Sequence, residues 1–215
     1  MPNWVYNRVY GNKKVTDLLV GPKGNVTFQK LIPEPEAFKC LCDFDYSSPN
    51  EIHALIDLVF HKNTDKLKSL LQRPVYKGLT LDSLADTLLS KYPYVQLQVC
   101  KKLIEDTGFF DWYTWRCSYW GCKWDADSDE GTYNGDEEEI EFETPWSPPE
   151  GVMKEIASKH PDLKFTWHCD EESCAFSIDF IFNGDGTITE VEVPPEYYTP
   201  YVPEEDELED DEDAN

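Results

Sequence analysis

Lysine and arginine are scarce in the C-terminal part of this 215-residue chain. Residues 126–215 contain 3 basic and 29 acidic residues, a net charge of -26, whereas residues 1–125 contain 16 and 14, a net charge of +2, so the whole negative charge of -24 comes from the C-terminal part. A surface of this sign repels nucleic acid and anionic membranes, and it attracts basic proteins, including those whose basic grooves bind nucleic acid. We therefore expect neither nucleic acid nor a membrane as a direct partner. A charge that only keeps an aromatic-rich protein in solution is the alternative.

Long apolar runs are also missing. No segment approaches the ~20 apolar residues of a membrane span. Residues 1–4 have neither the basic nor the apolar region of a secretion signal. The seven cysteines are an odd number, which cannot all pair within one chain. Together these features predict a reducing cytoplasm and free thiols.

The common catalytic motifs are absent as well. There is no glycine-rich phosphate loop, serine nucleophile turn, metalloprotease helix motif or EF-hand loop. Cys117, Cys122, Cys169 and Cys174, with His168, suggest a four-ligand zinc site, but four residues between paired ligands lie at the edge of the usual range. We therefore expect no catalytic residues, no metal and no cofactor.

Aromatic residues dominate the stretch 112–149. Five of the seven tryptophans lie there, and an acidic, glycine-containing insert at 127–141 separates its two halves. Large rings bury much of the area of any core or interface, so this stretch is expected to organise the chain.

Apolar periodicity predicts an α+β protein. Strands are expected at 3–10, 26–32, 139–144, 163–167, 175–182 and 187–193. Helices are expected at 50–59, 66–72, 80–89, 94–104, 112–119 and 150–159. The implied division is N-terminal strands at 1–48, a helical insertion at 49–120, the C-terminal part of the sheet domain at 121–193 and a disordered acidic tail at 194–215.

Four sequence patterns resemble one family. They are Met-x-Asn-Trp-x-x-Asn at 1–7, Phe-x-Lys-Leu-Ile-Pro-x-Pro-Glu at 28–36, Trp-Gly-x-Lys-Trp-Asp-Ala at 120–126 and Thr-Pro-Trp-Ser-Pro-Pro at 144–149. In these patterns the chain resembles phage and plasmid proteins with a YubB-type ferredoxin-like domain. The resemblance implies a ferredoxin-like antiparallel sheet with helices on one face, a gene carried by a bacteriophage or mobile element, and the cytoplasm of the infected bacterial host. It implies no established activity. Cys122 stands where we expect a threonine.

Two groups of residues are candidates for partner binding. The acidic group comprises Asp136, Glu137, Glu138, Glu139, Glu141, Glu143, Glu190 and Glu192. Alternate residues of a strand stand ~6.5–7 Å apart on one face, a spacing comparable with that of DNA phosphates. The aromatic and loop group comprises Trp120, Lys123, Trp124, Asp125 and Trp146.

These candidates predict an acidic, nucleic-acid-mimicking or charge-based inhibitor. Its expected partner is a basic host protein that handles nucleic acid or defends against phage. Two alternatives remain open. One is an enzyme that acts on a small molecule or nucleotide in a pocket near Trp120–Asp125, and the other is a virion or assembly accessory protein.

Overall fold

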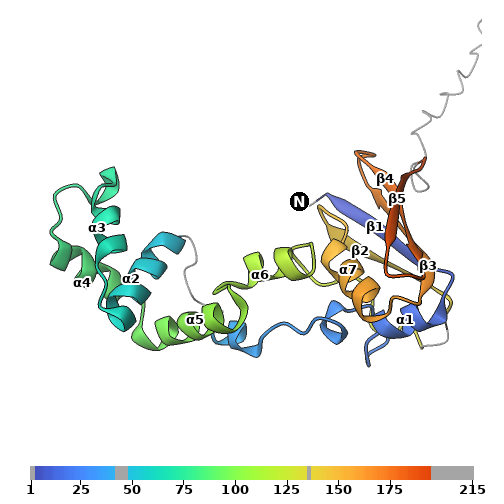
Figure 1. Cartoon of the computed structure of the whole chain (residues 1–215), viewed down its shortest axis with the longest axis horizontal. Coiled ribbons are helices and arrows are strands. Elements are labelled where there is room, and N and C mark those ends of the chain that lie inside the picture. The colour runs from blue at the N-terminus through green and yellow to red at the C-terminus, as the bar shows by residue number, and fades with distance from the viewer. Residues whose placement is uncertain (1–2, 42–47, 135–136, 195–215) are drawn as a thin grey trace, which may run out of the picture.

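The computed structural model describes residues 3–41, 48–134 and 137–194. A sheet domain built from both ends of the chain lies at one end of the molecule, and a helical arm lies at the other (Figure 1). Helix α6 (Trp112–Tyr119) and the neighbouring segment 31–41 run between them.

Within the described ranges, the sheet has five strands in the order β2-β1-β3-β4-β5, and every neighbouring pair is antiparallel. The strands are β1 (Trp4–Tyr10), β2 (Glu139–Pro145), β3 (Lys164–Glu171), β4 (Ser177–Asn183) and β5 (Ile188–Glu192). Strands β2 and β3 both flank β1, and α7 (Glu150–Lys159) connects them, which is the split β-α-β unit of ferredoxin-like folds. The α+β, ferredoxin-like class predicted from the sequence is confirmed.

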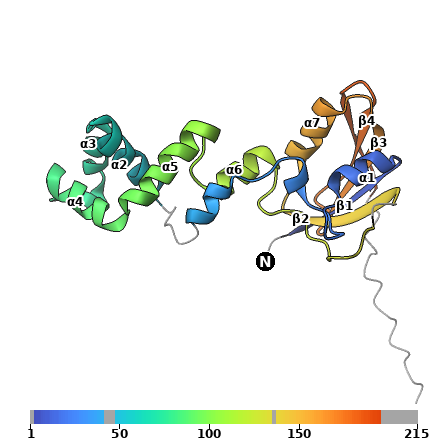
Figure 2. The same ribbon diagram turned by 90° about the horizontal axis from the view of Figure 1, so that it is seen from below.

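Helices α1 (Lys13–Leu19) and α7 cover one face of the sheet (Figure 2). In β1, Val5, Asn7 and Val9 are buried on that face and alternate with half-buried residues on the other, which we call the open face. The register places Trp167 of β3 and Phe142 of β2 on the helix-covered side. Strand alternation therefore separates an apolar core from a polar face.

The helical arm contains four α-helices among the described residues. They are α2 (Pro49–His61), α3 (Asp65–Leu71), α4 (Leu81–Lys91) and α5 (Tyr94–Thr107). A capping box between Thr80 and Ser83 begins α4, and Gly108, with a φ of 84°, ends α5. No helix in the described part of the chain combines the length and apolar character needed to cross a bilayer.

The strand predicted at 26–32 is wrong. Val26 makes only an isolated bridge to Val20, and Phe28–Lys30 forms a 3-10 helix. The carboxylate of Asp125 accepts hydrogen bonds from the backbone N–H of Phe28 at 2.6 Å and from the hydroxyl of Thr27 at 2.7 Å. A side-chain acceptor therefore replaces the neighbouring strand that an extended segment would require.

Smaller differences concern the ends of elements. Strand β3 continues to Glu171, four residues beyond the predicted end at 167. The expected tail lies outside the described residues apart from its first residue, Pro194.

Candidate functional site

Glu139, Glu141 and Glu143 form a row of carboxylates on the open face of β2. Their cross-strand partners on β1 are Tyr10, Arg8 and Tyr6. The guanidinium of Arg8 contacts Glu139 at 2.7 Å and approaches Glu141 at 3.9 Å. One cation therefore offsets part of the charge at one end of the row.

Negative charges are crowded at the other end of the row, around Glu143. The pKa of Glu143 is raised above its ordinary value, first by burial and then by the negative charges of Asp127 and Glu172. The backbone of Asp127 pairs with that of Glu143, which brings a second acidic segment alongside β2. We use the name acidic surface for six residues of these segments, Asp127, Asp129, Glu139, Glu141, Glu143 and Glu172.

A hollow of about 440 Å³ lies beside this row. Its lining includes Asp127, Asp129, Glu141 and Glu143, and Tyr6 contributes a ring from β1. The hydroxyl of Tyr133 bonds both the N–H and the C=O of Glu141, and the N–H of Tyr133 donates to Gly24. These hydrogen bonds hold the segment around Tyr133 against β2 and against the turn at Gly24.

The other predicted acidic residues do not join this row. Glu190 and Glu192 of β5 pair with Phe180 and Ile178 of β4. They therefore lie on the helix-covered side, at the opposite edge of the sheet. Glu137 accepts the N–H of Asn134, Glu138 is exposed, and Asp136 lies outside the described residues. The single acidic row expected from the sequence is therefore limited to β2.

Trp120 and Asp125 have structural contacts. Trp120 is fully buried, and its indole N–H donates to the carbonyl of Ile32 at 3.0 Å. Burial raises the pKa of Asp125, while N–H and O–H donors from Phe28, Thr27 and Ala126 oppose the rise. Their polar atoms are engaged in holding segment 27–32 rather than directed into a cavity.

Lys123, Trp124 and Trp146 lie together at the surface with two residues absent from the prediction, Trp4 and Tyr113. The ring centroids of Trp124 lie 6.1 Å from Trp4 and 5.6 Å from Trp146. The ammonium of Lys123 lies 4.8 Å from the Trp124 ring centroid, 5.1 Å from that of Trp146 and 5.9 Å from that of Tyr113. We call these five residues the aromatic–lysine cluster. Trp146 is 47% exposed and Tyr113 is 50% exposed.

Trp146 adopts an unusual backbone conformation. Its φ is 64°, in the left-handed region that a bulky side chain seldom occupies. The N–H of Trp146 donates to Asn3, and the hydroxyl of Ser147 donates to Gly121, both at 2.8 Å. Such strain persists where surrounding contacts impose it, and it concentrates at functional sites.

Two of the sequence patterns are explained by buried contacts. Asn7 donates to the hydroxyl of Thr144 and accepts from the indole of Trp167, each at 3.0 Å. Gly121 and Gly151 lie where the end of α6 meets α7, and a Cβ on Gly151 would lie 2.1 Å from the carbonyl oxygen of Tyr119. These residues hold the aromatic stretch against the sheet.

Cys122, Cys169 and His168, three of the residues considered for a zinc site, make separate contacts. Cys122 donates to the carbonyl of Trp124 and Cys169 donates to Asn7, while His168 points to the open face, as alternation predicts. The ring nitrogens of His168 lie 2.8 Å from Asp179 and 3.2 Å from Asp170. Within the ranges described, no group of three or more His, Cys, Asp or Glu side chains is placed to hold a metal ion.

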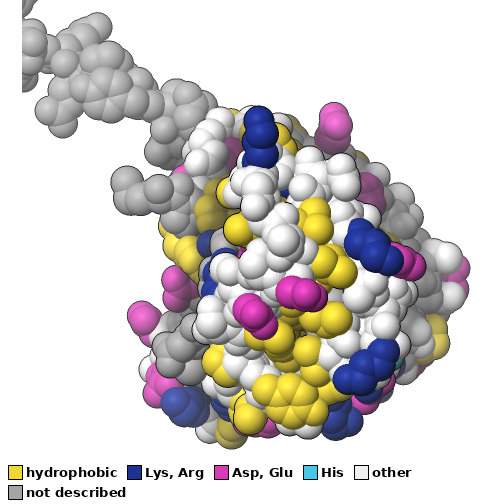
Figure 3. Space-filling model, turned by 90° about the vertical axis from the view of Figure 1, so that its left-hand side faces the viewer, with side chains coloured by type: hydrophobic (Ala, Val, Ile, Leu, Met, Phe, Trp, Pro, Cys, Tyr) yellow, Lys and Arg dark blue, Asp and Glu magenta, His cyan; other side chains and the backbone are white. Residues whose placement is uncertain are grey.

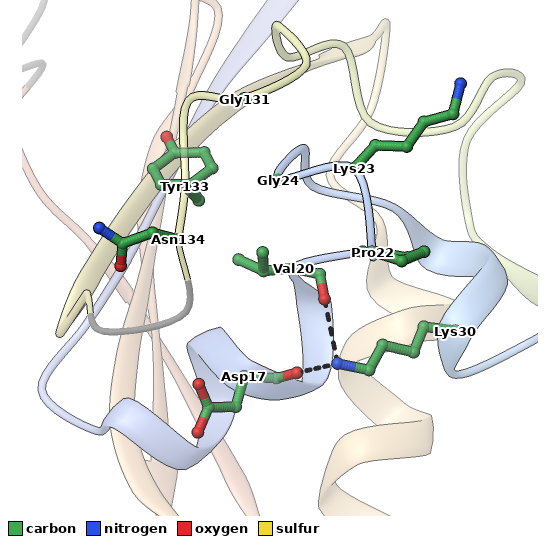
Figure 4. Close-up of a pocket in the computed structure, with 10 residues that line it drawn as sticks. Asp17, Val20, Pro22, Lys23, Gly24, Lys30, Gly131, Tyr133 and Asn134 are labelled. Carbon is green, nitrogen blue, oxygen red and sulfur yellow. Dashed lines mark hydrogen bonds between the residues drawn. The ribbon is translucent and has the colours of Figure 1, made fainter.

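Two further surfaces have no assigned ligand. A hollow of about 560 Å³ lies between the loops that carry Lys23 and Tyr133 (Figure 4). The ammonium of Lys30, which lines it, is bonded to the carbonyls of Asp17 and Val20 at the end of α1. Apolar side chains also gather on the end of the helical arm (Figure 3), where the region from η3 (Pro74–Tyr76) to α4 exposes Val75, Leu79 and Leu89.

The fold and these surfaces define an α+β protein with a ferredoxin-like domain and an acidic open face. Residues 119–213 match a family model described as the ferredoxin-like domain in Api92-like protein. The match begins at the end of α6, so strand β1, which lies between β2 and β3, comes from outside it and completes the sheet. Searches of curated proteins and of solved structures found no match.

Proposed function

We propose that this chain is a non-enzymatic binding protein whose acidic surface engages a basic surface of a host protein. It acts as a charge-based inhibitor in the cytoplasm of a bacterial host, and its gene belongs to a bacteriophage or mobile element. Its target is a nucleic-acid-handling or anti-phage defence protein. The resemblance to phage and plasmid proteins supports this origin, and the match to the domain in Api92-like protein agrees with the fold part of that resemblance.

The observation that carries the proposal is the crowding of carboxylates at Glu143. Burial is the largest cause of the raised pKa of Glu143, and the negative charges of Asp127 and Glu172 raise it further, so these three carboxylates repel one another. A cation from a partner relieves this repulsion on binding. A basic protein surface supplies several such cations at once, and long-range attraction raises the rate of encounter.

Nucleic-acid mimicry is the narrower form of the proposal. Three carboxylates alternate along β2, and Arg8 is paired with the first of them. Because Glu190 and Glu192 lie on the other face, the row is short. A compact acidic contact therefore fits the surface better than an extended copy of a phosphate backbone.

The test is a pull-down from bacterial lysate with the tagged chain at low and high salt. One variant carries Glu141→Gln and Glu143→Gln, and its matched control carries Glu190→Gln and Glu192→Gln, with the same charge change on the opposite face. We expect a basic protein to be captured by the intact chain and the control, to be lost from the first variant, and to be released by salt. Equal loss from both variants, or capture that salt does not weaken, would refute a localised acidic site.

A further inference from the structure

The aromatic–lysine cluster differs from the other tryptophans because its rings surround a cation. Among the described residues, Lys123 makes no ion pair, and its ammonium lies within 6 Å of three ring centroids, those of Tyr113, Trp124 and Trp146. Attraction between a cation and a ring face acts over this distance. The indole faces therefore already hold a positive charge in the isolated chain.

The same corner of the sheet domain adjoins the acidic surface. The N–H of Glu172 donates to the carbonyl of Trp4 at 2.9 Å, so an exposed glutamate lies beside Trp4 in the sheet domain. Trp4 also pairs with Pro145, the residue before Trp146, at the end of β2 that carries Glu143. A side chain bound over the rings would thus have carboxylates at its edge.

These contacts specify the chemistry of the occupant. A guanidinium is planar and weakly hydrated, so it stacks on an indole and still donates to a carboxylate, whereas an ammonium is compact and strongly hydrated. We infer that the aromatic–lysine cluster is an arginine-anchoring site, in which an arginine of the basic partner displaces Lys123 from the faces of Trp124 and Trp146 and donates to the adjoining carboxylates. The inference rests on the proposed function and gives the partner surface a preference for arginine over lysine.

A single-stranded nucleic acid is the competing occupant, because bases also stack on exposed rings. The charge argues against it, since the neighbouring carboxylates repel phosphates and Lys123 is the single cation of the cluster. The two occupants predict opposite roles for this lysine. It competes with a bound arginine, but it would help to hold a phosphate.

The experiment uses the full chain and two probes of equal charge, nona-arginine and nona-lysine peptides, with calorimetry at one ionic strength. We expect the intact chain to bind nona-arginine about fivefold more tightly. That ratio should fall to about one in Trp124→Leu and Trp146→Leu, and it should rise in Lys123→Gln, whose side chain no longer competes for the rings. Indole N–H resonances of Trp124 and Trp146 should shift with nona-arginine.

A second variant separates this inference from the proposal beneath it. Glu139→Gln with Glu141→Gln should weaken both peptides similarly, because it lowers the charge of the acidic surface without removing a ring or the carboxylates of Glu143 and Glu172 that adjoin the cluster. Equal binding of both peptides by the intact chain would overturn the arginine site alone, and no binding of either would overturn the acidic-surface function as well. Binding of an oligothymidylate that is lost in Lys123→Gln would also overturn the arginine site.

Discussion

Glu51 is a buried carboxylate on which the helical arm depends. It lies in the first turn of α2, is 8% exposed, and accepts hydrogen bonds from the hydroxyls of Tyr76 and Tyr92 and from the ammonium of Lys91. These donors come from η3, α4 and the residue that follows α4. Replacing Glu51 by Gln keeps the shape but removes the charge and turns an amide N–H₂ toward the donors. Hydrogen bonds to a buried charge are worth about 1.5–3 kcal/mol, so we expect the free energy of unfolding to fall by about 2–3 kcal/mol at neutral pH.

The loss should depend on pH. Burial raises the pKa of Glu51, but hydrogen bonds from Tyr76, Tyr92 and Lys91 and the charge of Lys91 outweigh it, so the pKa lies below its ordinary value of 4.5. A depressed folded-state pKa stabilises the protein above the unfolded-state pKa, and this contribution disappears as the pH falls through the folded-state pKa. The difference between the parent chain and Glu51→Gln should therefore shrink in acid.

Urea unfolding followed by far-ultraviolet circular dichroism measures the effect, and amide exchange in α2 and α4 assigns it to the arm. Glu105→Gln is the control, because Glu105 makes an exposed pair with Lys101 within α5 and should change the stability by at most about 0.5 kcal/mol. Equal stability of Glu51→Gln and the control would refute the reasoning, as would a difference that stays constant in acid.

Three further changes test the sheet domain by urea unfolding. Asn7→Ala should cost about 2–3 kcal/mol, because the buried indole N–H of Trp167 loses its acceptor, and an unchanged midpoint would contradict this. Gly151→Ala should cost about 1–3 kcal/mol, because the added Cβ meets the backbone of Tyr119, whereas a neutral result would mean that α6 and α7 separate easily. Trp146→Gly should be about 1 kcal/mol more stable than Trp146→Leu, since only glycine adopts a φ of 64° without strain; the opposite order would rule out backbone strain.

The sequence predicts most of the sheet because strand alternation is local. Strict alternation of Glu and apolar residues at 139–144 predicts both the strand and its exposed face. At 26–32 the same kind of pattern predicts a strand that does not form. Val26 and Phe28 are both buried, as in a strand, but Asp125, 97 residues from Phe28, accepts the backbone N–H that a neighbouring strand would bind. No local pattern contains that acceptor.

Candidate sites were predicted less completely than strands, for a related reason. Trp124 and Trp146 could be proposed from composition, but Trp4 joins them only through pairing of β1 with β2, and Tyr113 only through the placement of α6. The different roles of Trp120 and Trp124, one buried and one at the surface, depend on the turn at Gly121. Likewise, alternation makes Glu190 appear equivalent to Glu141 until the register with β4 places it on the opposite face.

Two features that cost stability meet at one corner of the sheet domain. Trp146 holds a strained backbone and an exposed ring, and beside it Glu143 and Glu172 repel each other. Other polar side chains have matched partners, as in the two hydrogen bonds between the half-buried Arg116 and Glu34, both 2.7 Å long. Lys62 and Cys174 also adopt a positive φ, so what distinguishes this corner is the combination of a strained, exposed ring with crowded carboxylates. On the proposed function, an arginine brought by a partner would cover the ring and neutralise the carboxylates together.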